Sequence, residues 1–228
     1  LYKPIVRDHL SMLYVLSTYK GQGRLAGQNF TVVKAQVSSN FRNIATAVGN
    51  DAIQQLELSL PNPLLNELKL LTTLDKVLIK RHNLPDELYN KTQIAELNRL
   101  LQISLSDDMA LEGVVPFGEL KLPPGEIGGF EIEYTMMKES EDSELLRSFH
   151  TTSSLTLTVI DNSDRNLMVR AKAIHAGALK PLAGTDSVSQ WELREIVLPQ
   201  QGVLIWWKQR PSSSARTPRI RNTPTPPT

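Results

Sequence analysis

The hydrophobic residues of this 228-residue chain change their spacing near Ser106, and this change limits the folds that the sequence can adopt. Before that point, apolar side chains recur mostly three or four positions apart, as on one face of an α-helix. After it, they alternate with polar side chains, as in β-strands. Helices and strands that occupy separate parts of a chain are typical of the α+β class. We therefore expect an α+β protein with a helical N-terminal region, an antiparallel β-sheet region and an extended C-terminal arm.

The same change of period predicts the domain organisation. Residues 1–105 form a mainly helical region, and residues 106–207 form an antiparallel sheet region that can share one core with the helices. Residues 208–228 form an extended arm rich in Pro, Thr and Arg, because this segment has too few apolar side chains to fold by itself. We find no internal repeat.

Four helices are expected in the first region. Apolar spacing, together with prolines and glycines at their ends, predicts them over about 4–19, from about 40 to Pro61, over about 63–82 and over 85–103. A shorter β-branched run over 30–37 predicts one strand among them. The helical region is therefore not purely α.

Alternation predicts the strands of the second region. Residues 130–136 alternate strictly, and a hairpin is expected from 154–160 and 166–174 across the turn-forming residues 161–164. Further strands are expected over 190–198 and 202–207, and a short helix over about 144–149. In the return strand of the hairpin, Arg170 and Lys172 share one face, which can lie opposite Glu131 and Glu133.

Composition excludes several classes of protein. The chain has no cysteine, which excludes a disulfide scaffold and a cysteine-ligated metal site, and its 40% hydrophobic content is too high for a disordered chain. No apolar run approaches the roughly 20 residues of a membrane-spanning helix. The chain starts with Leu1, so the sequence neither indicates nor excludes a signal peptide.

No catalytic signature stands out in the sequence. The four histidines (His9, His82, His150 and His175) are scattered without metal-binding spacing, and no Gly-x-Ser-x-Gly element exists. The glycines at 21, 23 and 27 follow an expected helix, so they indicate a connection rather than a phosphate loop. We therefore predict no enzyme, no catalytic, cofactor-binding or metal-binding residue, no cofactor and no small-molecule substrate.

The formal net charge of +1 hides an asymmetry. From Lys208 onward there are five basic residues and no acidic one, so 20 basic and 24 acidic residues remain before it. The body therefore carries about −4 and the arm +5. Four of the acidic residues gather at positions 139, 141, 142 and 144, where they can form a solvated loop, bind a cation or dock onto a basic partner.

The candidate contact residues follow from the basic arm and from the tryptophans before it. Arginine binds phosphates through paired hydrogen bonds, and in a strand Trp206 and Trp207 point to opposite faces, so that one of them is available to a partner. The predicted nucleic-acid or partner contacts are Trp206, Trp207, Lys208, Arg210, Arg216, Arg219, Arg221, Arg170 and Lys172. Thr217, Thr223 and Thr225 precede prolines and are candidate phosphorylation sites.

These features favour a non-enzymatic structural or assembly protein, of the viral coat, matrix or movement type, that self-associates. Its partners would be copies of itself, RNA or DNA bound through the arm, or an anionic membrane surface. The sequence does not indicate its location, which would be the virion or the host cytoplasm if the protein is viral. Two alternatives stay open: a nucleic-acid-binding accessory protein that uses Arg170, Lys172 and the arm, and a hydrolase whose site is assembled only in space, with His150 or His175 beside a carboxylate.

Overall fold

A computed structural model describes residues 4–46, 51–63, 65–107 and 109–210 of the chain. The fold is mostly β, with 57% strand and 11% helix. The expected α+β class, with a helical N-terminal region before the sheet, is therefore wrong. Two helices and thirteen strands are found in the described residues, and strands fill both halves of the chain.

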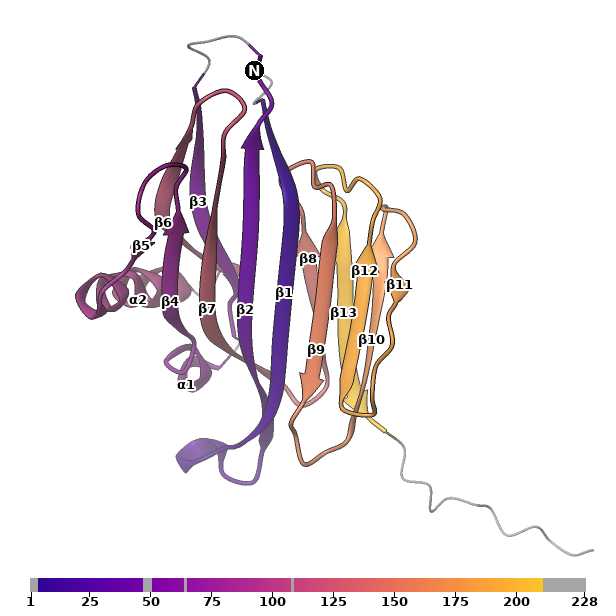
Figure 1. Cartoon of the computed structure of the whole chain (residues 1–228). Coiled ribbons are helices and arrows are strands. Elements are labelled where there is room, and N and C mark those ends of the chain that lie inside the picture. The colour runs from indigo at the N-terminus through magenta and orange to yellow at the C-terminus, as the bar shows by residue number, and fades with distance from the viewer. Residues whose placement is uncertain (1–3, 47–50, 64, 108, 211–228) are drawn as a thin grey trace, which may run out of the picture.

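The largest layer is an eight-stranded sheet (Figure 1). Its strands are, in spatial order, β11 (Lys180–Pro181), β12 (Val188–Leu193), β9 (Leu155–Asp161), β1 (Ile5–Lys20), β2 (Asn29–Asn43), β7 (Ile127–Glu139), β4 (Thr73–Lys80) and β5 (Glu87–Leu88). Neighbouring strands are antiparallel except β1 and β9, which run parallel. Its two edge strands have only two residues each, which leaves short free edges.

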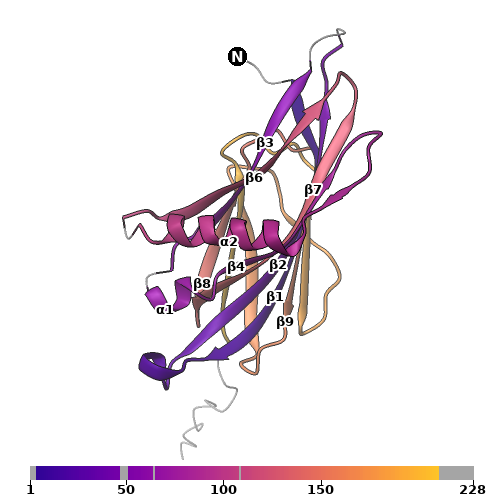
Figure 2. The ribbon, with the colours of Figure 1, turned by 90° about the vertical axis from the view of Figure 1, so that its left-hand side faces the viewer.

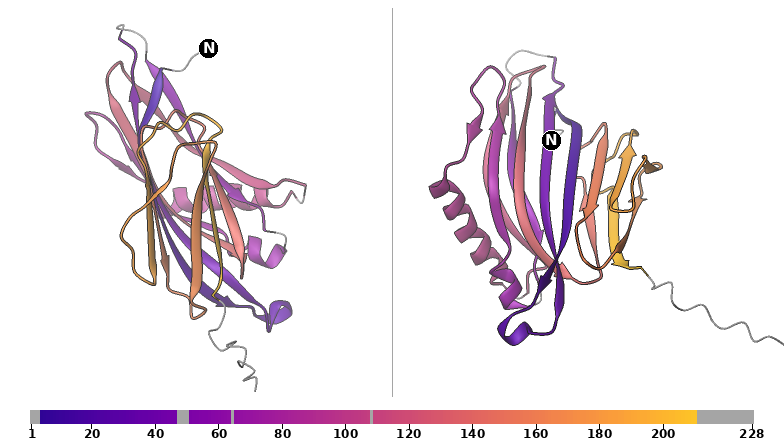
Figure 3. Two further views of the ribbon diagram at one scale, coloured as in Figure 1. Left: turned by 90° about the vertical axis from the view of Figure 1, so that its right-hand side faces the viewer. Right: turned by 60° about the horizontal axis from the view of Figure 1, so that its bottom comes forward.

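Two smaller sheets lie against the same face of the large sheet (Figures 1 and 3). One pairs β3 (Ala52–Pro61) with β6 (Glu112–Leu122), and the other has the order β10 (Leu167–Ile174), β13 (Gly202–Gln209) and β8 (Asp142–Arg147). Side chains from both small sheets and from the large sheet form one buried cluster. That cluster draws residues from both sides of position 105, so the described body is built around a shared core.

Helix α2 (Lys91–Leu105) packs against β4 and β6, whereas α1 (Asn66–Lys69) is a single turn between β3 and β4 (Figure 2). A capping box starts α2, because the Asn90 side chain accepts the N–H groups of Thr92 and Gln93. The Asn98 side chain also bonds both the N–H and the C=O of Leu74 on β4, at 2.7 and 2.8 Å. The helix therefore provides hydrogen-bond partners for the backbone of β4, near one edge of the large sheet.

Three of the four expected helices are wrong. Residues 5–19 belong to β1, residues 40–60 belong mainly to β2 and β3, and the described residues of 63–82 contain the turn α1 followed by β4. Register shifts between Arg7 and His9 in β1 and between Leu74 and Lys76 in β4 explain part of the error. A bulge adds a residue, so that buried positions two apart become three apart, which resembles helical spacing.

The fourth helix is present in part, because α2 begins at Lys91 rather than at Pro85. The strands expected over 30–37, 130–136 and 202–207 are found as β2, β7 and β13. The helix expected over 144–149 is wrong, because residues 142–147 form β8. The hairpin expected from 154–174 is also wrong. Its two strands exist as β9 and β10, but β9 pairs with β1 and β12, whereas β10 pairs with β13 in another sheet.

Candidate functional site

The outward face of the three-stranded sheet gathers most of the contact residues that the sequence predicts within the described chain. Alternation along each strand decides which side chains point outward, because the opposite set packs into the core. We call this surface the platform face. Its outward residues are Ser143, Leu145 and Arg147 on β8, Leu204, Trp206 and Lys208 on β13, and Met168, Arg170, Lys172 and Ile174 on β10.

Trp206 lies at the centre of the platform face. The registers place it opposite Arg170 on one side and Ser143 on the other. The next row along the strand places Leu204 between Lys172 and Leu145, whose side chain is 40% exposed. Trp206 and Leu204 on β13 therefore form an apolar centre, and basic side chains lie beside it on β10.

The four basic residues of the platform face have no carboxylate partner. Arg147, Arg170, Lys172 and Lys208 form no ion pair with any residue that the structure describes, and none of the outward residues of these strands is acidic. Unpaired cations on one surface attract anions through their summed field. The platform face is thus a positive, partly apolar surface.

Trp207 is not part of this surface. Its side chain is 1% exposed and packs in the core, so the two adjacent tryptophans point to opposite faces of β13. Burial removes Trp207 from the set of predicted contact residues. Its ring N–H has no hydrogen-bond partner in the described chain, which is a local cost of that burial.

The remaining predicted contacts are separate from the platform face. The guanidinium of Arg210 lies 3.8 Å from the carboxylate of Asp186 and donates a hydrogen bond to the backbone carbonyl oxygen of Asp186 at 3.2 Å. The other predicted residues lie outside the described residues: Arg216, Arg219, Arg221, Thr217, Thr223 and Thr225. The basic pair Arg170 and Lys172 does not face Glu131 and Glu133, because those two residues lie on β7 and pair with lysines of β4.

Sequence reasoning missed Arg147 and Leu145. Both were assigned to a helix, although the run Ser143, Leu145, Arg147 alternates with the inward Glu144 and Leu146. That alternation was the signal for a strand. The alternating run is short and lies next to acidic residues, so by itself it is weak evidence for a strand.

The acidic residues 139–144 lie where the chain turns from β7 into β8, two strands that belong to different sheets and are not paired with each other. We call this connection the acidic hairpin. Glu144 points inward and pairs with Lys138 at 2.7 Å, and both side chains are largely buried. Burial raises the pKa of the Glu144 carboxyl above its usual range, and the ammonium of Lys138 opposes that rise. Asp142 lies 3.9 Å from the same ammonium, whereas Glu139 and Glu141 are exposed.

The histidines do not form a shared site. His9 approaches the hydroxyls of Ser154 and Thr156, His82 lies 3.5 Å from Glu126, and the ring of His150 packs edge-on against Phe41. Within the described ranges, no group of three or more His, Asp or Glu side chains can hold a metal ion. No helix in those ranges has the length and apolar character to cross a membrane.

Comparison with known proteins identifies no family. No family model and no curated protein matches the chain. Among solved structures, it is similar to a putative protease from Parabacteroides distasonis (8% identity, TM-score 0.44, 90% of this chain and 41% of that one). It is also similar to an M1 zinc metallopeptidase from Deinococcus radiodurans (8% identity, TM-score 0.38, 90% and 42%).

The chain therefore spans about two fifths of the length of the solved structures that it matches. At these identities and TM-scores, no shared activity follows.

Proposed function

We propose that this chain is a non-enzymatic binding module that engages single-stranded nucleic acid through the platform face. One observation carries the proposal: Trp206 faces outward from the central strand among four basic side chains that have no acidic partner in the described chain. A ring on an open sheet stacks against any base, and cations beside it contact the phosphates. The fixed strand registers hold these groups in place before a ligand arrives.

The sequence and the charge distribution support the same proposal. Lys208, at the end of β13, is part of the platform face, and the arm that follows adds arginines but no acid. Arginine contacts phosphate through two parallel hydrogen bonds, which suits an extended basic arm. The arm and the platform face are continuous in the chain, so one strand of nucleic acid can contact both.

A role in a viral particle, which the sequence suggested first, has no support in the fold or in the comparisons. Self-association through opposite charges is a separate matter, and no specific contact of the described residues favours it. The proposal therefore rests on the platform face.

The test is the binding of labelled single-stranded oligonucleotides to the full chain, followed by fluorescence anisotropy at several salt concentrations. Base stacking contributes about 1–3 kcal/mol, so Trp206→Leu should weaken binding roughly tenfold or more. Four phosphate contacts predict a slope of about −3 for log K against log salt. The matched control is Trp191→Leu, which removes a partly buried tryptophan from β12 and should leave the affinity unchanged.

Two outcomes would overturn the proposal. One is equal affinity of the Trp206→Leu and native chains for every oligonucleotide. The other is binding to vesicles of anionic lipid with no binding to oligonucleotides, which would assign the positive surface to membranes instead.

A further inference from the structure

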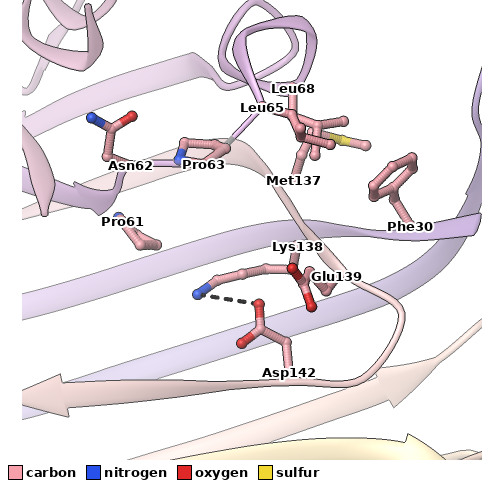
Figure 4. Close-up of a pocket in the computed structure, with 10 residues that line it drawn as sticks. All are labelled: Phe30, Pro61, Asn62, Pro63, Leu65, Leu68, Met137, Lys138, Glu139 and Asp142. Atoms are coloured by element: carbon pink, nitrogen blue, oxygen red, sulfur yellow. Dashed lines mark ion pairs between the residues drawn. The ribbon is translucent and has the colours of Figure 1, made fainter. Parts of the chain in front are cut away.

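A cavity lies beside the acidic hairpin, between the end of β3, the turn α1 and the β7–β8 connection (Figure 4). Its volume is about 320 Å³. It lies apart from the outward residues of the platform face, and none of its lining residues belongs to that surface. The cavity is therefore a separate candidate site.

One wall of the cavity is apolar. Phe30, Leu65, Leu68 and Met137 contribute aromatic, aliphatic and thioether groups, and Pro61 and Pro63 extend this wall (Figure 4). Phe30, Leu68 and Met137, together with Leu25, also form a small buried cluster that is separate from the main core. Aromatic and proline side chains on one wall suit an extended segment that carries prolines or a branched aliphatic residue.

The other wall is acidic. Glu139 and Asp142 line it, and Glu141 lies in the turn between them. Lys138 also lines it, but its ammonium already contacts Glu144 at 2.7 Å and Asp142 at 3.9 Å. The acidic hairpin therefore has four carboxyl groups against one lysine, and Glu139 has no ion-pair partner among the described residues. The nearby Arg165 reaches the hairpin through the carbonyl of Ser140. This wall favours a cationic ligand.

The C-terminal arm leaves the body at the same hairpin. The backbone N–H of Gln209 donates to the Glu141 carboxylate at 3.1 Å, and Trp207 lies opposite Asp142 in the β8–β13 register. The chain then continues from Pro211 to Thr228 with five prolines, three arginines and no acidic residue. Its single large apolar side chain, Ile220, lies between Arg219 and Arg221.

We propose that this cavity is a binding site for a Pro- and Arg-rich extended segment, and that its occupant is residues 216–221 of the chain's own arm. Ile220 enters the apolar wall, and the flanking arginines bind the carboxylates of the acidic hairpin. Nine residues lie between Arg210 and Ile220, and these ten Cα–Cα steps span up to about 33 Å when extended. Gln209 contacts Glu141, the neighbour of the cavity-lining Asp142, so the arm begins beside the cavity.

Docking has a consequence for the arm. Arginines bound to the acidic hairpin are not available to phosphates elsewhere, so the docked state withholds positive charge from an external polyanion. A phosphate on Thr217 or Thr223 would place negative charge beside Glu139 and Asp142 and release the segment. The inference does not depend on the nucleic-acid proposal, because the cavity and the platform face share no residue.

The experiment uses the full chain with a photoreactive phenylalanine analogue at position 220 and maps the crosslinked peptides by mass spectrometry. Equal amounts of unlabelled and ¹⁵N-labelled chains are mixed before irradiation, so that the isotope pattern separates crosslinks within one chain from crosslinks between chains. We expect crosslinks within one chain to residues 61–68 or 137–142. The same analogue at position 213 is the positional control and should crosslink there at least fivefold less.

Two variants test the walls of the cavity. Leu65→Asp places a charge in the apolar wall, and Leu70→Asp is its matched control, because Leu70 is 73% exposed and does not line the cavity. Glu139→Lys reverses one charge of the acidic wall. We expect Leu65→Asp and Glu139→Lys to lower the crosslink yield at least fivefold and Leu70→Asp to leave it unchanged, with circular dichroism to confirm that each variant is folded.

Crosslinks that map to another surface, or no crosslink at all, would overturn the proposal. Crosslinks only between differently labelled chains would also overturn docking within one chain and would assign the cavity to the arm of a second copy. Loss of oligonucleotide binding alone would leave the crosslinks in place, so failure of the two proposals can be distinguished.

Discussion

Two sheet surfaces of this protein carry rows of basic side chains, and only one of them neutralises those charges. On the outer face of the large sheet, Lys76 of β4 contacts Glu133 of β7 at 3.1 Å, and Lys80 contacts Glu131 at 2.5 Å. On the platform face, no carboxylate of the described chain contacts the basic residues. A cation that is paired with a carboxylate of the same sheet is already neutralised, whereas an unpaired cation can bind an anionic partner. The same residue types therefore have different roles because of what the neighbouring strand presents.

The largest expected effect concerns Lys138 and Glu144, the ion pair whose two side chains are both largely buried. Lys138→Met removes the ammonium that contacts Glu144 and leaves a buried carboxylate with no cation. Breaking a buried pair on one side costs about 3–5 kcal/mol, and we expect a loss of that size in the free energy of unfolding, measured with urea at pH 7. A loss below about 1 kcal/mol would show that Glu144 reaches water or takes up a proton in the folded state of the variant.

The second prediction concerns the unpaired basic residues of the platform face, where we expect an effect on binding and not on stability. Arg170→Ala combined with Lys172→Ala should weaken oligonucleotide binding roughly tenfold and reduce the salt slope by about 1.4, because two phosphate contacts are lost. Stability should change by less than about 0.5 kcal/mol, since neither side chain is paired or buried. Lys34→Ala combined with Lys91→Ala removes the same charge from exposed positions elsewhere and serves as the control. An equal loss of oligonucleotide affinity in that control variant would mean that binding depends on net charge alone.

The third prediction applies the same change to the neutralised surface. Lys76→Ala combined with Lys80→Ala should lower the free energy of unfolding by about 1 kcal/mol, because partly exposed pairs contribute 0.2–1 kcal/mol each. Oligonucleotide affinity should remain within about twofold of the native value. If this double variant weakened binding as much as the platform variant does, the distinction between the two surfaces would be lost.

The smallest effect is the pH dependence of the neutralised surface. The hydrogen bond from Lys80 lowers the pKa of the Glu131 carboxyl below its usual range. A carboxyl with a lowered pKa in the folded state stabilises the fold above its unfolded pKa and loses that contribution as the pH falls. The difference in stability between the native chain and Lys80→Met should therefore be larger at pH 7 than at pH 3, as measured by thermal unfolding. A constant difference would mean that the pair contributes no electrostatic stabilisation.

The N-terminal half shows where reading the sequence failed. In β3, residues 56, 58 and 60 are leucines with polar residues between them, so period two was visible there, but the prediction extended a helix across it. In β1, Leu13 and Val15 add apolar residues to the outer face, and the register shift between Arg7 and His9 disturbs the pattern further. Apolar side chains on both faces of one strand hide its period of two.

The candidate site was predictable only in part. Opposite directions for Trp206 and Trp207 follow from strand geometry, and the outward position of Arg170 and Lys172 follows from alternation along their strand. The pairing of β10 with β13, which brings these residues together, was not predicted, because proximity in the chain favoured a hairpin with β9. Likewise, the acidic run was evident, but its position beside an apolar cavity was not.

The sequence by itself determined the local features: the capped helix α2, the alternating strands β7 and β13, the opposite directions of the two tryptophans and the charge contrast between body and arm. These depend on residues that are close in the chain, whose spacing and side-chain chemistry act directly on the backbone. Only the tertiary structure decided which strands are neighbours, which cations are neutralised and where the arm leaves the body. Those outcomes depend on contacts between distant residues, and the register of β13 against β10 or β8 cannot be read from the spacing of residues in any one of these strands.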